Sequence, residues 1–189
     1  MSFGGFAFME RPSHADKDDA PAGFPEQWVI VALGANLGNA ADNVRRGFER
    51  LEELAEKHIL RSSVWETTPV NCPPESPKFA NAVAAWMPHP EETPETFLTR
   101  LQELEKEFGR KPKLVLNEAR TLDLDLITFG QEIRITTRLI LPHPRAHLRR
   151  FVLQPLAEIA SGLVLPGQQK SVGELLASLP EDPAIKRLS

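Results

Sequence analysis

Residues 28–39 read Trp-Val-Ile-Val-Ala-Leu-Gly-Ala-Asn-Leu-Gly-Asn, an apolar run that ends in a turn bracketed by Gly34 and Gly38. A continuous run of apolar side chains is typical of a strand in the middle of a sheet, where both faces are buried. Beyond the turn, apolar residues recur with helical spacing, at Val44, Phe48, Leu51 and Ala55. We therefore expect a central strand, a glycine turn and an amphipathic helix.

Further strands and helices follow along the chain. Residues 60–67 alternate between apolar and polar side chains, which predicts a half-buried strand, and residues 79–87 predict another. Thr93 is placed to cap a helix that Pro94 opens, and Gly109 is placed to end it. The chain thus predicts two strands and then a second helix.

The last third of the chain predicts a strand over residues 121–129, with residues 133–141 returning as its hairpin partner. Residues 146–160 have a helical pattern that should split or kink at Pro155, and residues 171–174 form a capping box. The order strand, helix, strand, strand, helix, strand predicts an α+β fold. The specific expectation is a ferredoxin-like (split βαβ) sandwich, a mixed and mainly antiparallel sheet flanked by helices.

The composition is that of one globular domain: 189 residues, 41% apolar and 25% charged. Residues 1–26 carry two basic and five acidic side chains, so we expect a flexible acidic tail before a single domain over residues 27–189. No apolar run approaches the roughly 18 residues that a membrane span needs. The single cysteine, Cys72, excludes an internal disulfide and is compatible with a reducing compartment. We expect a cytoplasmic monomer that binds no membrane.

Charge is distributed unevenly. The formal net charge of −4 argues against a nucleic-acid-binding protein, which usually needs a basic balance. Residues 110–150 nevertheless hold nine Lys or Arg and four acidic residues, a local charge of +5 in a chain whose remainder is −9. This basic segment indicates a compact anionic ligand such as a polyphosphate; a solvated basic surface is the alternative.

Two carboxylates lie within the basic segment, in the sequence Arg120-Thr121-Leu122-Asp123-Leu124-Asp125-Leu126. On a strand the three leucines face the core and Asp123 and Asp125 share the other face, with β-carbons about 6–7 Å apart. That spacing suits two divalent ions about 3.5–4 Å apart, and carboxylate ligands favour Mg²⁺. The alternative is an ordinary amphipathic strand facing water. Arg110 and Arg120 bracket the preceding loop and could bind phosphates, or Arg120 could simply neutralise an aspartate.

Five short segments occur in a distinctive order: residues 34–38 (Gly-Ala-Asn-Leu-Gly), 79–83 (Phe-Ala-Asn-Ala-Val), 120–125 (Arg-Thr-Leu-Asp-Leu-Asp), 141–145 (Leu-Pro-His-Pro-Arg) and 149–156 (Arg-Arg-Phe-Val-Leu-Gln-Pro-Leu). Together they resemble the 6-hydroxymethyl-7,8-dihydropterin pyrophosphokinase family of folate biosynthesis, over residues 28 to about 165. The resemblance implies a ferredoxin-like fold and the transfer of pyrophosphate from MgATP to the pterin hydroxymethyl group, with release of AMP. It also implies that Asp123 and Asp125 hold two Mg²⁺ ions, while Arg110 and Arg120 bind and transfer the phosphates.

The same resemblance implies two sets of substrate-binding residues. Those matched to the pterin are Thr67, Val70, Phe79, Asn81 and Phe151, the two phenylalanines stacking on its faces. Those matched to ATP or its phosphates are Leu98, Gln102, Glu105, Arg110, Lys113, Arg120, Leu126, Arg138, His143 and Arg149. Each residue alone has a simpler explanation, as a core aromatic, a satisfied buried amide, a strand-end cap, a turn or a solvated helix face. The combination favours the binding site.

This sequence departs from the family pattern in two loops. Residues 110–120 lack an arginine that is common near Pro112, and Lys113 offers a point charge in place of a guanidinium fork. Thr68 stands where a proline is common. Two other functions remain open: a different Mg²⁺-dependent phosphotransferase or nucleotidyltransferase, and a non-catalytic binding module of the same fold.

Overall fold

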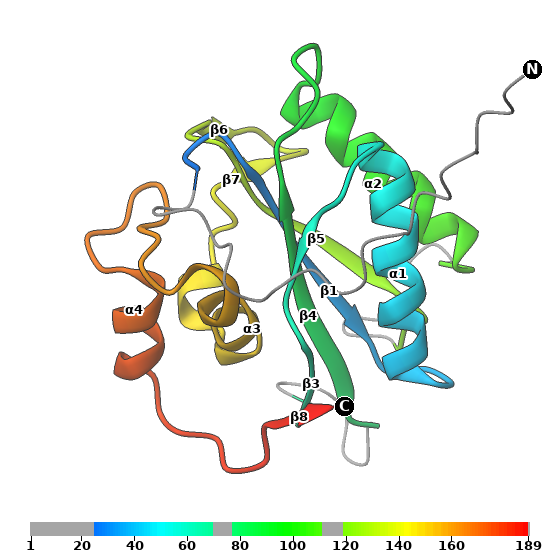
Figure 1. The fold of residues 1–189 in the computed structure, drawn as a ribbon, viewed down its shortest axis with the longest axis vertical. Coiled ribbons are helices and arrows are strands. Elements are labelled where there is room, and N and C mark those ends of the chain that lie inside the picture. Colours follow the sequence, from blue (N-terminus) through cyan, green and yellow to red (C-terminus); the bar gives the residue numbers. More distant parts are fainter. Residues whose placement is uncertain (1–24, 70–76, 111–118, 189) are drawn as a thin grey trace, which may run out of the picture.

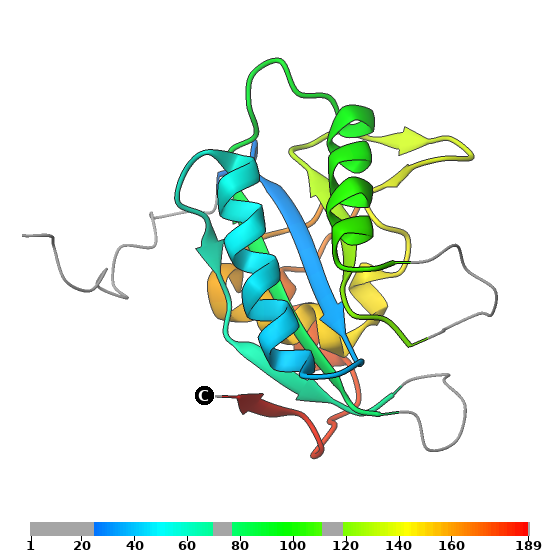
Figure 2. The ribbon, with the colours of Figure 1, turned by 90° about the vertical axis from the view of Figure 1, so that its right-hand side faces the viewer.

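The computed structural model describes residues 25–69, 77–110 and 119–188. A central β-sheet lies between two pairs of helices (Figure 1). Helices α1 (Ala40–Ala55) and α2 (Pro94–Glu107) cover one face, and α3 (Arg150–Ala160) and α4 (Val172–Ser178) cover the other, as the turned view in Figure 2 also shows. The prediction of a sheet flanked by helices is confirmed.

The sheet is antiparallel at every described pairing. Its strand order is β5-β1-β4-β3-β8, and β2 also pairs with β4, while β6 and β7 form a separate two-stranded sheet. The strands are β1 (Val29–Ala35), β2 (Leu60–Arg61), β3 (Val64–Thr67), β4 (Phe79–Trp86), β5 (Asp123–Phe129), β6 (Arg134–Ile135), β7 (Ile140–Leu141) and β8 (Lys186–Leu188). Strand β1 is central, as its apolar run predicts.

Side chains of β1 alternate between two hydrophobic cores, one on each face of the sheet. Val29, Val31 and Leu33 pack with α1 and α2, whereas Ile30 packs with α3 and α4. All four are at most 2% exposed. Burial on both faces explains why this strand has a continuous apolar sequence and not an alternating one.

The helix ends follow their sequence signals. The Asn39 side chain accepts a hydrogen bond of 3.2 Å from the Asp42 N–H at the start of α1. Thr93 caps α2 in a capping box with Thr96, and Ser171 caps α4 in the capping box with Glu174. The predicted caps at Thr93 and Ser171 are confirmed, and Asn39 is a further cap that the sequence analysis did not assign.

Residues 60–67 form two short strands, so the prediction of one continuous strand is wrong. Ser62 interrupts it: its N–H donates to the Val83 carbonyl at 2.9 Å and its hydroxyl accepts from the Val83 N–H at 2.9 Å. A side-chain oxygen thus takes the place of one backbone acceptor. A serine hydroxyl can compete with backbone groups for hydrogen bonds, and the alternation of apolar residues does not reveal this.

Residues 133–141 do not pair with the strand before them, which corrects the second prediction. They close on themselves as the β6–β7 hairpin, where the Thr136 N–H donates to the Leu139 carbonyl and the Leu139 N–H donates to the Thr136 hydroxyl, both at 3.0 Å. The tight turn satisfies these groups locally. Strand β5 is therefore an edge strand of the described sheet.

The helical segment 146–160 breaks at Arg149 and not at Pro155, contrary to the prediction. A short 3₁₀ turn covers Ala146–Leu148, Arg149 has extended backbone angles (φ −114°, ψ 106°), and α3 then begins at Arg150. Pro155 remains inside α3, where it is buried. Its burial offsets the single helical hydrogen bond that proline cannot donate.

Glu158 fastens α3 to the sheet. Its carboxylate accepts hydrogen bonds from the Ser63 N–H at 2.8 Å, the Ser63 hydroxyl at 2.7 Å and the Trp65 indole at 3.2 Å, and pairs with Arg187 of β8 at 2.8 Å. Burial by itself raises the pKa of Glu158, but the hydrogen bonds from Ser63 and Trp65 outweigh it and hold the pKa below its ordinary value.

Some predictions fall on residues outside the described ranges. These are most of the acidic tail over 1–26, the pterin contact Val70, the phosphate contact Lys113 and the free cysteine Cys72. Within the described ranges, no helix is both long enough and apolar enough to cross a membrane.

Candidate active site

Strand β5 presents a pair of carboxylates. Leu122, Leu124 and Leu126 are 1%, 5% and 4% exposed and face the core with α1 and α2, which confirms the predicted alternation. The Asp123 and Asp125 side chains lie on the other face and are 20% and 42% exposed. Burial, together with the charge of Asp123, raises the pKa of Asp125. Two acids crowded in this way are stabilised by added positive charge.

Three arginines supply that charge. Arg110 Nη1 lies 2.9 Å from Asp123 Oδ1, and Arg120 Nη1 donates to Asp123 Oδ2 at 2.5 Å. Arg149 Nη1 lies 3.7 Å from Asp125 Oδ2. Arg120 therefore does neutralise an aspartate, Asp123, which was the alternative to phosphate binding. The same geometry places guanidinium groups beside the carboxylates, where phosphate oxygens could accept from them.

His143 and Arg149 lie near the second aspartate. Burial lowers the pKa of His143, while the negative charge of Asp125 acts in the opposite direction. The backbone N–H of His143 donates to the Ile127 carbonyl of β5 at 2.8 Å, which fixes the histidine beside the strand. Arg149 lies over the Phe151 ring, with its guanidinium carbon 5.4 Å from the ring centroid. Arg149 thus joins the carboxylate region to an aromatic residue of α3.

A second polar pair lies across the sheet from the carboxylates. The Asn81 amide donates to the Thr67 hydroxyl at 2.7 Å, and the two residues are 6% and 3% exposed. In the strand register, Asn81 of β4 is opposite Gly34 of β1, and Gly34 is opposite Asp123 of β5. The amide and the carboxylate therefore lie in one row across three strands.

Gly34 leaves room at the centre of this row. A β-carbon at this position would lie 3.2 Å from Asn81 Oδ1, which is tighter than an ordinary contact. The Asn81 carbonyl oxygen therefore faces the space above Gly34. A flat heterocycle that needs a hydrogen-bond acceptor could use this oxygen, since the Asn81 amide nitrogen already donates to Thr67.

The two predicted stacking aromatics come from different elements. Phe79 begins β4 opposite Thr67, and Phe151 lies in the first turn of α3, packed against the core of that face. Both are partly exposed, unlike the fully buried aromatics Trp86 and Phe97 of the core with α1 and α2. Partial exposure leaves ring surface for a ligand.

The remaining predicted ATP residues lie around α2. Leu98 is partly buried against the core, Gln102 is exposed, and Arg138 donates from the β6–β7 hairpin to the Thr99 hydroxyl at 2.8 Å. Leu126 is buried in the core. The structure thus places Leu98, Gln102 and Arg138 beside one helix, and their contact with a nucleotide stays a prediction.

Glu105 differs from these neighbours because it is 3% exposed. Its Oε1 accepts from the backbone N–H of Leu124 at 2.8 Å, and it forms an ion pair with Arg110. Burial raises the pKa of Glu105 to about 7. The carboxylate lies within the structure and not on a solvated face of α2.

Asn36 is a site residue that the sequence pattern does not single out: it is 4% exposed and contacts the site. Its side-chain oxygen accepts from the Arg120 N–H at 2.8 Å, and its own N–H donates to the Arg120 carbonyl at 3.0 Å. The glycine turn after β1 thereby holds the backbone of an active-site arginine. An asparagine within a turn that follows a central strand was the available signal.

The carboxylate pair fits a divalent cation. Among the described residues, no group of three or more His, Cys, Asp or Glu side chains is arranged as a metal cage. A pair of aspartates with nearby arginines suits Mg²⁺, which is usually held by one or two carboxylates and completed by phosphate oxygens and water. The donor set therefore matches a metal that arrives with a nucleotide.

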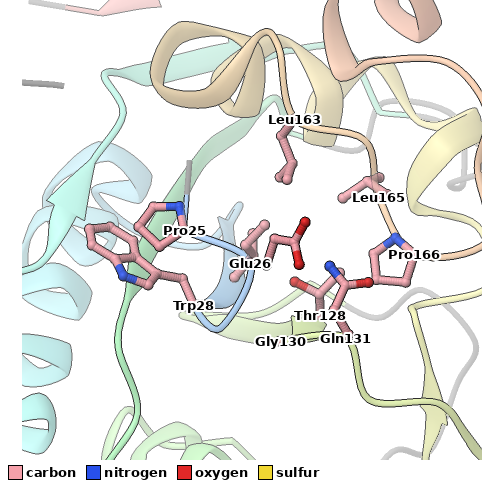
Figure 3. Close-up of a pocket in the computed structure, with 10 residues that line it drawn as sticks. Pro25, Glu26, Trp28, Thr128, Gly130, Gln131, Leu163, Leu165 and Pro166 are labelled. Carbon is pink, nitrogen blue, oxygen red and sulfur yellow. The ribbon is translucent and has the colours of Figure 1, made fainter. Parts of the chain in front are cut away.

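A separate hollow of about 210 Å³, including its open mouth, lies at the other end of β1 and β5 (Figure 3). The described residues that line it include Glu26, Trp28, Thr128, Leu163 and Pro166, and none of them is an arginine or a lysine. Without a cation it is unsuited to a polyphosphate. The carboxylate–arginine cluster is the better candidate for chemistry.

Paired carboxylates surrounded by arginines at one end of an antiparallel sheet define a phosphoryl-transfer class of site. Residues 30–161 match the family model described as 7,8-dihydro-6-hydroxymethylpterin-pyrophosphokinase (HPPK). The chain belongs to this family and is a pyrophosphokinase, a diphosphotransferase of folate biosynthesis.

Individual relatives agree with the family. The chain is 37% identical over 159 residues to the 2-amino-4-hydroxy-6-hydroxymethyldihydropteridine pyrophosphokinase of Haemophilus influenzae, covering 84% of this chain and 96% of the relative. It is also 37% identical to the enzyme of that name from Pseudomonas aeruginosa, covering 86% and 97%. A solved structure described as HPPK-DHPS in complex with substrates shares the fold, with a TM-score of 0.65 at 12% identity. That match covers 85% of this chain but 47% of the longer solved chain.

Proposed function

We propose that this protein transfers pyrophosphate from MgATP to the hydroxymethyl oxygen of 6-hydroxymethyl-7,8-dihydropterin, giving the pterin diphosphate and AMP. One observation carries the proposal: the row Asn81–Gly34–Asp123 sets a buried amide and a carboxylate on neighbouring strands. The substrates are then two small molecules bound at one end of the sheet. No nucleic acid or membrane takes part.

Asp123 and Asp125 are proposed to hold Mg²⁺, with two ions expected. Bound there, the metal would neutralise charge on the phosphate oxygens and polarise the phosphorus under attack. Arg110, Lys113 and Arg120 are proposed to bind the phosphates, with His143 and Arg149 on the α3 side of β5. The ion pairs of Asp123 with Arg110 and Arg120 support this, because those guanidiniums can pass from carboxylate to phosphate over a short distance.

The pterin is proposed to bind over Gly34. Asn81 and Thr67, with Val70, would bond the polar edge of the ring, while Phe79 and Phe151 stack on its faces. The buried Asn81–Thr67 hydrogen bond supports this assignment, because it fixes the amide with its oxygen toward Gly34. The adenine side would be bound by Leu98, Gln102, Leu126 and Arg138.

The reaction is a single displacement at the β-phosphorus of ATP. The pterin hydroxymethyl oxygen forms a bond to that phosphorus, and the bond from it to the oxygen bridging the α-phosphorus breaks. AMP leaves with the bonding electron pair, and the hydroxyl proton passes to water or to an aspartate. The protein contributes alignment and positive charge, which is most of what such transfers require.

We also propose that residues 27–189 form one domain, which acts as a cytoplasmic monomer. A ferredoxin-like, split βαβ classification is proposed for the sheet. The antiparallel order β5-β1-β4-β3, with α1 following β1 and α2 following β4, supports it.

The test is to incubate the protein with MgATP and the pterin and to identify both products. AMP formed in step with the pterin diphosphate is the expected result. ADP in place of AMP would indicate transfer of the γ-phosphoryl group and refute the proposed reaction. Binding of neither substrate would favour a non-catalytic module.

A further inference from the structure

Glu105 lies between three parts of the active site. It comes from the last turn of α2, accepts a hydrogen bond from the Leu124 N–H at 2.8 Å, and pairs with Arg110. Leu124 is the residue between the two aspartates. Glu105 is 3% exposed, and on an exposed residue such a set of contacts would be weak.

The hydrogen bond to Leu124 completes an open strand edge. Strand β5 pairs with β1 on one side, and no strand in the described ranges pairs with its other side. Backbone N–H groups along that edge need an acceptor, because a buried donor without one destabilises the fold by about 1–3 kcal/mol. The Glu105 carboxylate is that acceptor at the position between Asp123 and Asp125.

The contact to Arg110 adds a second restraint. The Arg110 guanidinium bridges Glu105 and Asp123, and its backbone N–H donates to the Glu105 carbonyl at 3.0 Å. Glu105 therefore fixes the start of the segment that follows α2 and, through Arg110, the first aspartate. A nucleotide contact would instead require the carboxylate to face solvent, as Gln102 does.

We propose that Glu105 is a positioning residue, whose buried carboxylate holds the Leu124 amide and Arg110 and thereby sets the geometry of Asp123 and Asp125 for the metal. The inference rests on the proposed function in assigning the metal to those aspartates. It replaces the expectation that Glu105 contacts ATP. Outer partners of this kind typically change metal affinity by about 10- to 100-fold when they are removed.

The test uses the full chain and three variants. Glu105→Met keeps the length and apolar bulk but has no strong acceptor, whereas Glu105→Gln keeps an acceptor oxygen for Leu124 and loses the charge. Glu103→Gln is the matched control, because Glu103 is an exposed residue of the same helix. Two quantities are measured: hydrogen exchange of the Leu124 amide, and Mn²⁺ affinity by electron paramagnetic resonance with a non-hydrolysable ATP analogue.

We expect Glu105→Met to speed exchange at Leu124 and to weaken Mn²⁺ binding about 10- to 100-fold. Glu105→Gln should keep Leu124 exchange within a few fold of the unaltered protein, and Glu103→Gln should change neither quantity. Unchanged exchange and Mn²⁺ affinity in Glu105→Met, with weaker binding of the analogue without metal, would overturn the proposal in favour of a nucleotide contact. If Glu105→Met does not fold, the Glu105→Gln variant tests the proposal alone. Exchange of its Leu124 amide as fast as that of an unpaired amide on a strand edge would overturn the proposal.

Failure of the proposed function would look different. The unaltered protein would then form no pterin diphosphate from MgATP and the pterin, while Leu124 exchange in the variants would still follow the presence of an acceptor at position 105. The exchange measurement is independent of turnover, so the two ideas can fail separately.

Discussion

Gly34→Ala tests the row across β4, β1 and β5. The added methyl carbon would lie 3.2 Å from Asn81 Oδ1, so the amide must move by a few tenths of an ångström. That movement strains the 2.7 Å hydrogen bond to Thr67 and fills the space proposed for the pterin. Loss of about one hydrogen bond, or roughly 1 kcal/mol, corresponds to about a fivefold weaker binding of the pterin.

The assay is pterin binding by fluorescence titration with an ATP analogue present, together with KM for each substrate. We expect KM for the pterin to rise about fivefold or more, since ring displacement adds to the lost bond, and KM for ATP to stay within twofold. Gly162→Ala is the matched control, because no atom lies within 4 Å of its added methyl group. An unchanged pterin affinity in Gly34→Ala, or an equal loss in Gly162→Ala, would refute the reasoning.

Three further predictions concern the metal, the phosphates and stability. Asp125→Ala should abolish transfer and leave thermal unfolding nearly unchanged; turnover in Mg²⁺ by this variant would contradict the metal assignment. Arg120→Ala should lower kcat more than it raises KM for the pterin, which steady-state kinetics measures; an equal kcat would reject its role in transfer. Glu158→Gln should lower the free energy of unfolding at pH 7 by about 1–3 kcal/mol in urea titrations, because charged hydrogen bonds to Ser63 are lost. The pKa of Glu158 is lowered in the folded state, so its contribution to stability is complete above the unfolded pKa of about 4.3 and fades as the pH falls. If the stability difference between Glu158→Gln and the unaltered protein grew below pH 4, this account of Glu158 would be wrong.

Local sequence signals were sufficient where neighbours in the chain determine the structure. The apolar run of β1, the cap at Thr93 and the alternation around Asp123 and Asp125 each depend on a few adjacent residues, and the structure confirms all three. The two aspartates face away from the core because successive side chains of a strand point to opposite faces.

Other features depended on contacts between distant segments. The sequence pattern placed the helix break at Pro155, but Pro155 is buried inside α3 and the break lies at Arg149. It paired residues 133–141 with β5, but a turn between Thr136 and Leu139 closes the hairpin on itself. The pattern of a single sequence does not show which distant residues compete for the same hydrogen bonds and packing positions.

The sequence by itself determined the strand and helix order, the charge of the basic segment and the shared face of Asp123 and Asp125, because these follow from composition and from local periodicity. The tertiary structure alone decided that Asn36 holds Arg120, that Gly34 leaves room before Asn81, and that Glu105 is buried. Each of these depends on the register and packing of elements far apart in the chain. The turn sequence marks Asn36 as a candidate, but the partner of each of these residues cannot be read from the residues next to it in the chain.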